Sequence, residues 1–103
     1  MLDFGFYNMD CMDGMKEFPD KSMDIIITSP PYNLGSNHHT GNKKTQAYSD
    51  DMPEAEYQEW QVRVLQECYR LLGDDGSMFY QHKNRIKDGK QLSPYEWCMA
   101  VLS

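Results

Sequence analysis

The residues best suited to chemistry are Ser29, Pro30, Pro31 and Tyr32, which directly follow the apolar run Met23–Thr28. The prolines hold φ at about −65° and donate no N–H, so this corner is rigid and offers carbonyl oxygens without competing donors. Ser29 adds a hydroxyl and Tyr32 a flat aromatic face. Oxygen acceptors beside an aromatic face suit a planar ring with an exocyclic amino group. The acceptors hold the amino hydrogens and stabilise the positive charge that grows on nitrogen as it attacks an electrophile.

The same residues also suit a plain proline-rich turn that ends a core strand, with Tyr32 packing inward. Short motifs of this kind arise by chance. The order Pro30-Pro31-Tyr32-Asn33 does not match the PPxY or PxxP peptide ligands. The rest of the chain must decide between a chemical and a structural role.

Strand and helix patterns alternate along the chain. Met23–Thr28 is rich in β-branched residues and predicts a strand buried on both faces, which is typical of parallel sheets. Asp10 is the expected N-cap of the first helix, which precedes this strand. Pro53 is the expected first residue of the long helix, and Gly73 is the expected end of that helix. We expect strands at 2–7, 23–28 and 77–81, and helices at 10–18, 53–72 and 94–102. This order predicts an α/β fold with a parallel sheet flanked by helices.

Two polar segments separate these elements. Residues 33–52 form a long loop pattern, which is usually functional or mobile in a compact domain. Residues 33–48 carry no acid and residues 82–90 carry one, so both stretches are basic although the chain has a net charge of −6, and a polyanionic partner stays open. The loop histidines are expected to be solvated, and no metal site is predicted. The residues concerned are His38, His39, Lys43 and Lys44 in the first segment, and Lys83, Arg85, Lys87 and Lys90 in the second.

The length of 103 residues and the composition suit one domain with a modest core. No apolar run approaches the roughly 18 residues of a membrane span, and the first residues lack the pattern of a signal peptide. The three cysteines, Cys11, Cys68 and Cys98, show no C-x-x-C spacing, which suits free thiols in a reducing compartment. We therefore expect a cytoplasmic protein that does not enter a membrane.

The stretch DIIITSPPYNLG, followed after the polar loop by EWQVRVLQECYRLLGDDGSMFYQHK, resembles the amino-methylating DNA methyltransferases. Members of that family transfer a methyl group from S-adenosylmethionine to N4 of cytosine or N6 of adenine. The resemblance covers residues 7–81 best. It implies a partial Rossmann-like (class I methyltransferase) sheet, DNA as the substrate and a setting of DNA methylation and restriction–modification.

The resemblance also implies roles for single residues. Ser29 and the Pro30 carbonyl would accept hydrogen bonds from the target amino group, Pro31 would stiffen the corner, and Tyr32 would stack on a flipped base. Asp10 lies where related enzymes often hold the cofactor, although a plain helix cap explains Asp10 equally well. Ser29 is expected to bind the cofactor as well. A serine at the head of this motif favours N4 of cytosine over N6 of adenine. No cysteine nucleophile is implied, and all three cysteines are expected in the core.

The chain departs from the family in one respect, because its seven glycines never form the G-x-G of the cofactor loop. We expect the target-recognition region to be absent as well. Residues 1–103 are thus expected to be an N-terminal catalytic part that needs a missing C-terminal half or self-associates. Two alternatives stay open. One is a non-catalytic remnant or assembly module. The other is a related enzyme acting on RNA or protein amides, where asparagine is more usual than Ser29.

Overall fold

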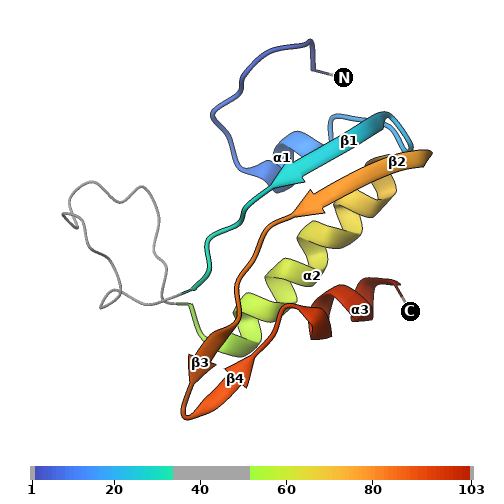
Figure 1. Cartoon of the computed structure of the whole chain (residues 1–103). Helices are drawn as coiled ribbons and strands as arrows, with labels where there is room; N and C mark the ends of the chain where they lie inside the picture. The colour runs from blue at the N-terminus through green and yellow to red at the C-terminus, as the bar shows by residue number, and fades with distance from the viewer. Residues whose placement is uncertain (1, 34–51, 103) are drawn as a thin grey trace.

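The computed structural model describes residues 2–33 and 52–102. The elements are α1 (Cys11–Met15), β1 (Met23–Thr28), α2 (Glu54–Leu71), β2 (Leu72–Tyr80), β3 (Arg85–Lys87), β4 (Lys90–Leu92) and α3 (Tyr95–Leu102) (Figure 1). Strands β1 and β2 form a parallel pair, and β3 and β4 form an antiparallel hairpin. This confirms the predicted α/β class with a parallel sheet flanked by helices.

The two parallel strands end at the same edge of the sheet. Thr28 pairs with Tyr80, and the amide of Gln81 donates to the Thr28 carbonyl at 2.9 Å. Because parallel strands run in one direction, the residues that follow them emerge side by side (Figure 1). Ser29 after β1 and His82 after β2 are therefore neighbours at the carboxyl edge, where α/β proteins commonly bind ligands.

Helix α2 supplies most of the core. Its buried side chains recur every three or four residues: Tyr57, Gln61, Val64, Leu65, Cys68 and Leu71. The apolar pattern of the sequence predicts this stripe except for the polar Gln61, whereas Trp60 and Leu72, also expected in it, are only partly buried. Trp97 of α3 joins this core, and Met78 and Tyr80 of β2 pack against it. The polar member, Gln61, accepts a hydrogen bond from the Tyr80 hydroxyl. Tyr80 in turn accepts one from the indole N–H of Trp97 at 3.1 Å.

Arg70, near the end of α2, fixes the connection between α1 and β1. Its guanidinium donates to the carbonyls of Met15 and Phe18 at 2.9 and 3.0 Å. It also forms ion pairs with Asp20 and Glu67 at 2.8 and 2.9 Å. The strand that precedes Ser29–Tyr32 thus starts from a connection that is bonded to the main helix.

Two expectations about the sheet were wrong. Residues 2–7 form no strand, and the side chains of Phe4 and Phe6 are fully exposed. Strand β1 is not buried on both faces, since Ile27 is 74% exposed and Ile25 is 55% exposed. Among the described elements, α2 covers only the opposite face, so the alternate side chains of β1 point into solvent.

Several element boundaries also differ. Asp10 is the N-cap of α1 as predicted, but that helix ends at Met15 rather than near residue 18. Pro53 is the N-cap of α2 and not its first residue. Gly73 does not end α2, because the backbone becomes extended at Leu72, with ψ at 134°, and β2 starts there.

The basic segment 82–90 contains a hairpin that the sequence analysis treated as a loop. Asp88 and Gly89 both have positive φ, 52° and 75°, between strands of three residues each. Two central residues with positive φ define the tight turn that suits the twist of a hairpin, and Asp-Gly is a preferred pair there. In the part of the chain that the structure describes, no helix has the length and apolarity to cross a membrane.

Candidate active site

The Ser29–Tyr32 corner leaves the end of β1 and carries two hydroxyls close together. The Oγ of Ser29 lies 3.1 Å from the hydroxyl of Tyr32, within hydrogen-bond distance. Ser29 is exposed, whereas Pro30, Pro31 and Tyr32 are partly buried. The structure thus brings the predicted acceptor and the predicted stacking ring together at the carboxyl edge of the sheet.

Two residues that the sequence analysis missed contact this corner. The hydroxyl of Tyr57, in the first turn of α2, donates to the Pro31 carbonyl. It also lies 2.6 Å from Nε2 of His82. The rings of His82 and Tyr32 are 4.9 Å apart at an interplanar angle of 48°. His82 follows the strand that pairs with β1, so the rule that ligands gather at the carboxyl edge was the signal that could have found it.

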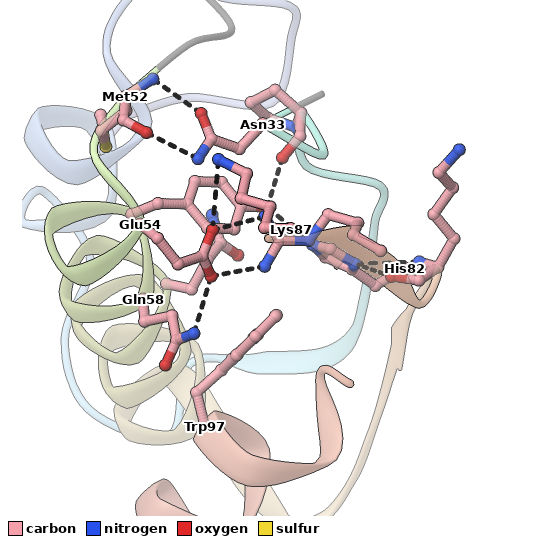
Figure 2. A network of polar contacts seen from close by, with 12 residues as sticks. Asn33, Met52, Glu54, Gln58, His82, Lys87 and Trp97 are labelled. Atoms are coloured by element: carbon pink, nitrogen blue, oxygen red, sulfur yellow. Dashed lines mark hydrogen bonds and ion pairs between the residues drawn. The ribbon is translucent and has the colours of Figure 1, made fainter. Parts of the chain in front are cut away.

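Asn33 closes the corner on its other side. Its backbone takes a positive φ of 57°, which asparagine tolerates better than most residues. Its buried side chain donates to the Met52 carbonyl at 2.8 Å and accepts from the Met52 amide at 2.7 Å (Figure 2). This pair of bonds joins the end of the corner to the residue before α2. The intervening loop, with His38, His39, Lys43 and Lys44, lies outside the described residues.

A buried ion pair lies next to these residues. Both terminal nitrogens of Arg85 donate to the Glu54 carboxylate, at 2.8 and 2.7 Å, and the Arg85 side chain is only 2% exposed. Gln58 donates to the same carboxylate at 2.7 Å, and Lys87 lies 3.6 Å from it (Figure 2). The guanidinium also lies over the ring of Tyr57, 4.8 Å from its centre. Arg85, expected in a basic loop, therefore points inward and anchors the hairpin to α2.

The charge of Glu54 is strongly favoured in the folded state. Burial alone would raise its pKa, but hydrogen bonds from Arg85 and Gln58, with the charges of Arg85 and Lys87, lower the pKa of Glu54 to about 2. The carboxylate is thus ionised at neutral pH, and the buried guanidinium keeps its counter-charge.

Asp10 lies beside the start of α2. Its Oδ1 accepts from the Met12 amide at 2.8 Å, so the carboxylate caps α1. It also lines a pocket of about 400 Å³, and the other lining residues are Met52, Glu56, Glu59, Trp60 and Arg63. Met52 therefore contacts both this pocket and the Asn33 side chain that ends the corner. Asp10 is at once a helix cap and a pocket residue.

The thiols of the three cysteines favour their protonated form. Burial raises the pKa of Cys68 to about 11 and also raises the pKa values of Cys11 and Cys98. A thiol at neutral pH is a weak nucleophile. Cys68 belongs to the core, but Cys11 is exposed, contrary to the expectation that all three are core residues. Within residues 2–33 and 52–102, no three His, Cys, Asp or Glu side chains are grouped to hold a metal ion.

Comparisons with known proteins give a consistent result. The profile of the N6/N4 methyltransferase family, described as DNA methylase, matches residues 23–100. The chain is 37% identical over 82 residues to type II methyltransferase M.BglII of Bacillus subtilis, covering 80% of this chain and 20% of the relative. It is 33% identical over 73 residues to type II methyltransferase M.BamHI of Bacillus amyloliquefaciens, covering 71% and 16%. It is also 33% identical over 70 residues to DNA adenine methyltransferase YhdJ of Escherichia coli K12, covering 68% and 21%. The chain spans about a fifth of the length of these relatives.

Proposed function

The chain belongs to the N6/N4 DNA methylase family, and we propose that it carries the target-base corner of an enzyme that methylates an exocyclic amino group in DNA. The observation that carries this proposal is the Ser29–Tyr32 corner itself. A serine hydroxyl and a tyrosine ring meet at the carboxyl edge of a parallel sheet, 3.1 Å apart at their oxygens. Ser29 and the Pro30 carbonyl accept the two amino hydrogens, and Tyr32 stacks on the base.

The residues of the corner act on the target nitrogen. Flipping a base out of a duplex costs a few kcal/mol, and stacking on Tyr32 returns roughly 1–3 kcal/mol. Acceptors on both amino hydrogens turn the nitrogen lone pair away from the ring and stabilise the positive charge that develops on nitrogen. The rigidity of Pro30 and Pro31 keeps these acceptors in place before the base arrives, so little reorganisation is needed.

The pocket at Asp10 suits one end of S-adenosylmethionine. That cofactor, when bound, supplies a methyl group made electrophilic by a positively charged sulfur. The carboxylates of Asp10, Glu56 and Glu59 favour a cationic ligand, and Trp60 offers an aromatic wall. We propose that Asp10 holds the cofactor from this pocket and that Ser29 faces it from the corner.

The choice of cytosine N4 over adenine N6 rests on Ser29. Serine at the head of the motif favours the cytosine enzymes, although one relative of this chain is named a DNA adenine methyltransferase. Mass spectrometry of nucleosides from methylated DNA separates N4-methylcytosine from N6-methyladenine. We propose N4-methylcytosine as the product.

The function is tested with radiolabelled S-adenosylmethionine and unmethylated DNA made by amplification of a whole genome, so that the recognition sequence need not be known. We expect label in DNA, a loss of roughly 100-fold in rate for Ser29→Ala, and a similar loss for Tyr32→Ala. Label in RNA or protein instead of DNA would support the related amide-modifying enzymes. No transfer by a folded protein that binds the cofactor would support a non-catalytic module.

A further inference from the structure

Resting on the proposed function, we propose that His82 and Tyr57 are positioning residues whose hydrogen-bond chain fixes the Ser29–Tyr32 corner for attack by the target amino group. The chain runs from Nε2 of His82 to the Tyr57 hydroxyl at 2.6 Å and from that hydroxyl to the Pro31 carbonyl. It connects His82 in the segment after β2, Tyr57 in the first turn of α2 and the corner after β1.

The direction of this chain follows from its ends. The Pro31 carbonyl can only accept, so the single proton of the Tyr57 hydroxyl points to it. The Tyr57 oxygen then accepts from Nε2 of His82, which carries the proton. Nδ1 lies 2.9 Å from both the amide and the carbonyl of Lys83, and in the neutral ring it accepts from the amide. Burial lowers the pKa of His82, which favours the neutral ring that this direction needs.

The chain has two consequences for the corner. It occupies the Pro31 carbonyl, so this oxygen does not compete with Ser29 and the Pro30 carbonyl for the target amino hydrogens. It also fixes the peptide plane between Pro31 and Tyr32, and thereby the direction in which the Tyr32 side chain leaves the backbone. The His82 ring lies 4.9 Å from the Tyr32 ring, which adds a second restraint on the ring that would stack on the base.

The anchor of the chain is rigid. Tyr57 is 1% exposed, and its ring is covered by the Arg85 guanidinium on one side and by Trp97 edge-on, with ring centres 6.1 Å apart. The Ser29–Tyr32 corner is thereby bonded to a core residue of α2 as well as being joined to the end of β1. Displacements of about 1 Å at reacting atoms can lower rates by roughly 100-fold, so such an anchor is able to act on catalysis.

The first test compares variants that remove one hydroxyl or one N–H each. In Tyr57→Phe we expect kcat for methyl transfer to fall roughly 10- to 100-fold while KM for S-adenosylmethionine stays unchanged, because the corner loses its alignment and the Asp10 pocket does not. His82→Gln, which keeps a donor near the Nε2 position, should retain more of kcat than His82→Phe, which keeps only the ring. Full kcat in Tyr57→Phe would overturn the proposal.

Tyr80→Phe is the matched control, because it also removes a partly buried tyrosine hydroxyl that makes two hydrogen bonds, here to Gln61 and Trp97. Neither of these two hydrogen bonds involves a residue of the Ser29–Tyr32 corner. We expect Tyr80→Phe to lower the unfolding midpoint about as much as Tyr57→Phe but to keep kcat. Equal losses of kcat in the two variants would show a general effect of stability and would overturn the positioning role.

A second readout does not depend on activity. In nitrogen NMR of the chain labelled at histidine, His82 should show its proton on Nε2. Tyr57→Phe should shift that signal more than Tyr80→Phe, because the Tyr80 ring stacks on His82 at 5.8 Å but its hydroxyl makes no hydrogen bond to it. A protein that transfers no methyl group contradicts the proposed function, and the NMR result then decides this inference separately. A proton on Nδ1 would overturn it, whereas a proton on Nε2 that responds to Tyr57→Phe would support it.

Discussion

At the scale of single residues, Asn33 shows how much one side chain contributes to the corner. It combines a positive φ with two hydrogen bonds to the backbone of Met52. Asparagine suits both needs, since its short amide tolerates the left-handed region and offers one donor and one acceptor in a fixed plane. The sequence analysis assigned Asn33 no role, because the partner of its amide lies 19 residues further along the chain.

Replacing Asn33 separates these contributions. We expect Asn33→Ala to lower the free energy of unfolding by roughly 2–4 kcal/mol, through two lost hydrogen bonds and the cost of positive φ for alanine. Asn33→Gly loses the same bonds without the backbone cost, so it should be the less destabilised of the two. Urea unfolding curves provide the measurement. Equal stability of Asn33→Ala and the wild-type chain would contradict a stabilising role for the two hydrogen bonds between Asn33 and Met52.

Asp10 has two roles that one pair of variants can separate. Asp10→Ser keeps an N-cap acceptor for α1 but removes the carboxylate from the pocket, whereas Asp10→Ala removes both. We expect Asp10→Ser to keep the stability of the chain and to weaken S-adenosylmethionine binding by about 10-fold, and Asp10→Ala to lose about 1 kcal/mol of stability as well. Calorimetric titration measures the binding. If Asp10→Ser binds as the wild type does, Asp10 is only a helix cap.

At the scale of elements, the Glu54–Arg85 pair joins α2 to the hairpin. Breaking a buried pair on one side costs about 3–5 kcal/mol, because the remaining charge has no partner. Glu54→Gln should therefore destabilise the chain strongly. Glu67→Gln is its matched control, since Glu67 pairs with the more exposed Arg70, and we expect a loss of about 1 kcal/mol or less.

The same pair predicts a dependence on pH. The pKa of Glu54 falls from 4.5 to about 2 on folding, so its ionised form contributes stability above pH 4.5. That contribution is lost as the pH falls from about 4.5 towards 2, where the carboxylate takes up a proton. Thermal melts across this range should show a steeper decline for the wild type than for Glu54→Gln. Parallel curves would contradict the assigned pKa.

At the scale of the whole molecule, the elements that the structure describes cover one face of the β1–β2 sheet. Ile25, Ile27 and Phe79 stand exposed on the face away from α2. Exposed apolar patches of this kind favour association. We predict that the chain alone forms dimers or larger assemblies at micromolar concentration and that Ile27→Lys shifts it towards the monomer. Sedimentation velocity measures the difference, and a monomeric wild-type chain would contradict the prediction.

The parts of the fold predicted from sequence are those with a long periodic signal. The stripe on α2 and the β-branched run of β1 were predicted almost to their ends, because each repeats the same preference over many residues. The hairpin was missed since its strands have three residues each, and residues 2–7 form no strand because alternation alone does not provide a neighbour to pair with.

The residues of the candidate site also divide into those that the sequence could indicate and those that it could not. Ser29, Pro30, Pro31 and Tyr32 could be chosen from their chemistry, because they are consecutive. Tyr57 and His82 could not, since they stand 25 residues apart and meet only through tertiary packing. Nothing in the local pattern around Tyr57 separates a core tyrosine from one whose hydroxyl also donates to the Pro31 carbonyl.

The most direct test of the central claim is nucleoside mass spectrometry of amplified, unmethylated DNA after incubation with the protein and S-adenosylmethionine. The account predicts methyl groups on an exocyclic amino nitrogen, with N4-methylcytosine as the product, and almost none with Ser29→Ala. If the product is N6-methyladenine and Ser29→Ala abolishes it, the proposed role of the corner stands and the target base is adenine instead of cytosine. Methyl groups on a ring carbon, or a yield unaffected by Ser29→Ala, would contradict it.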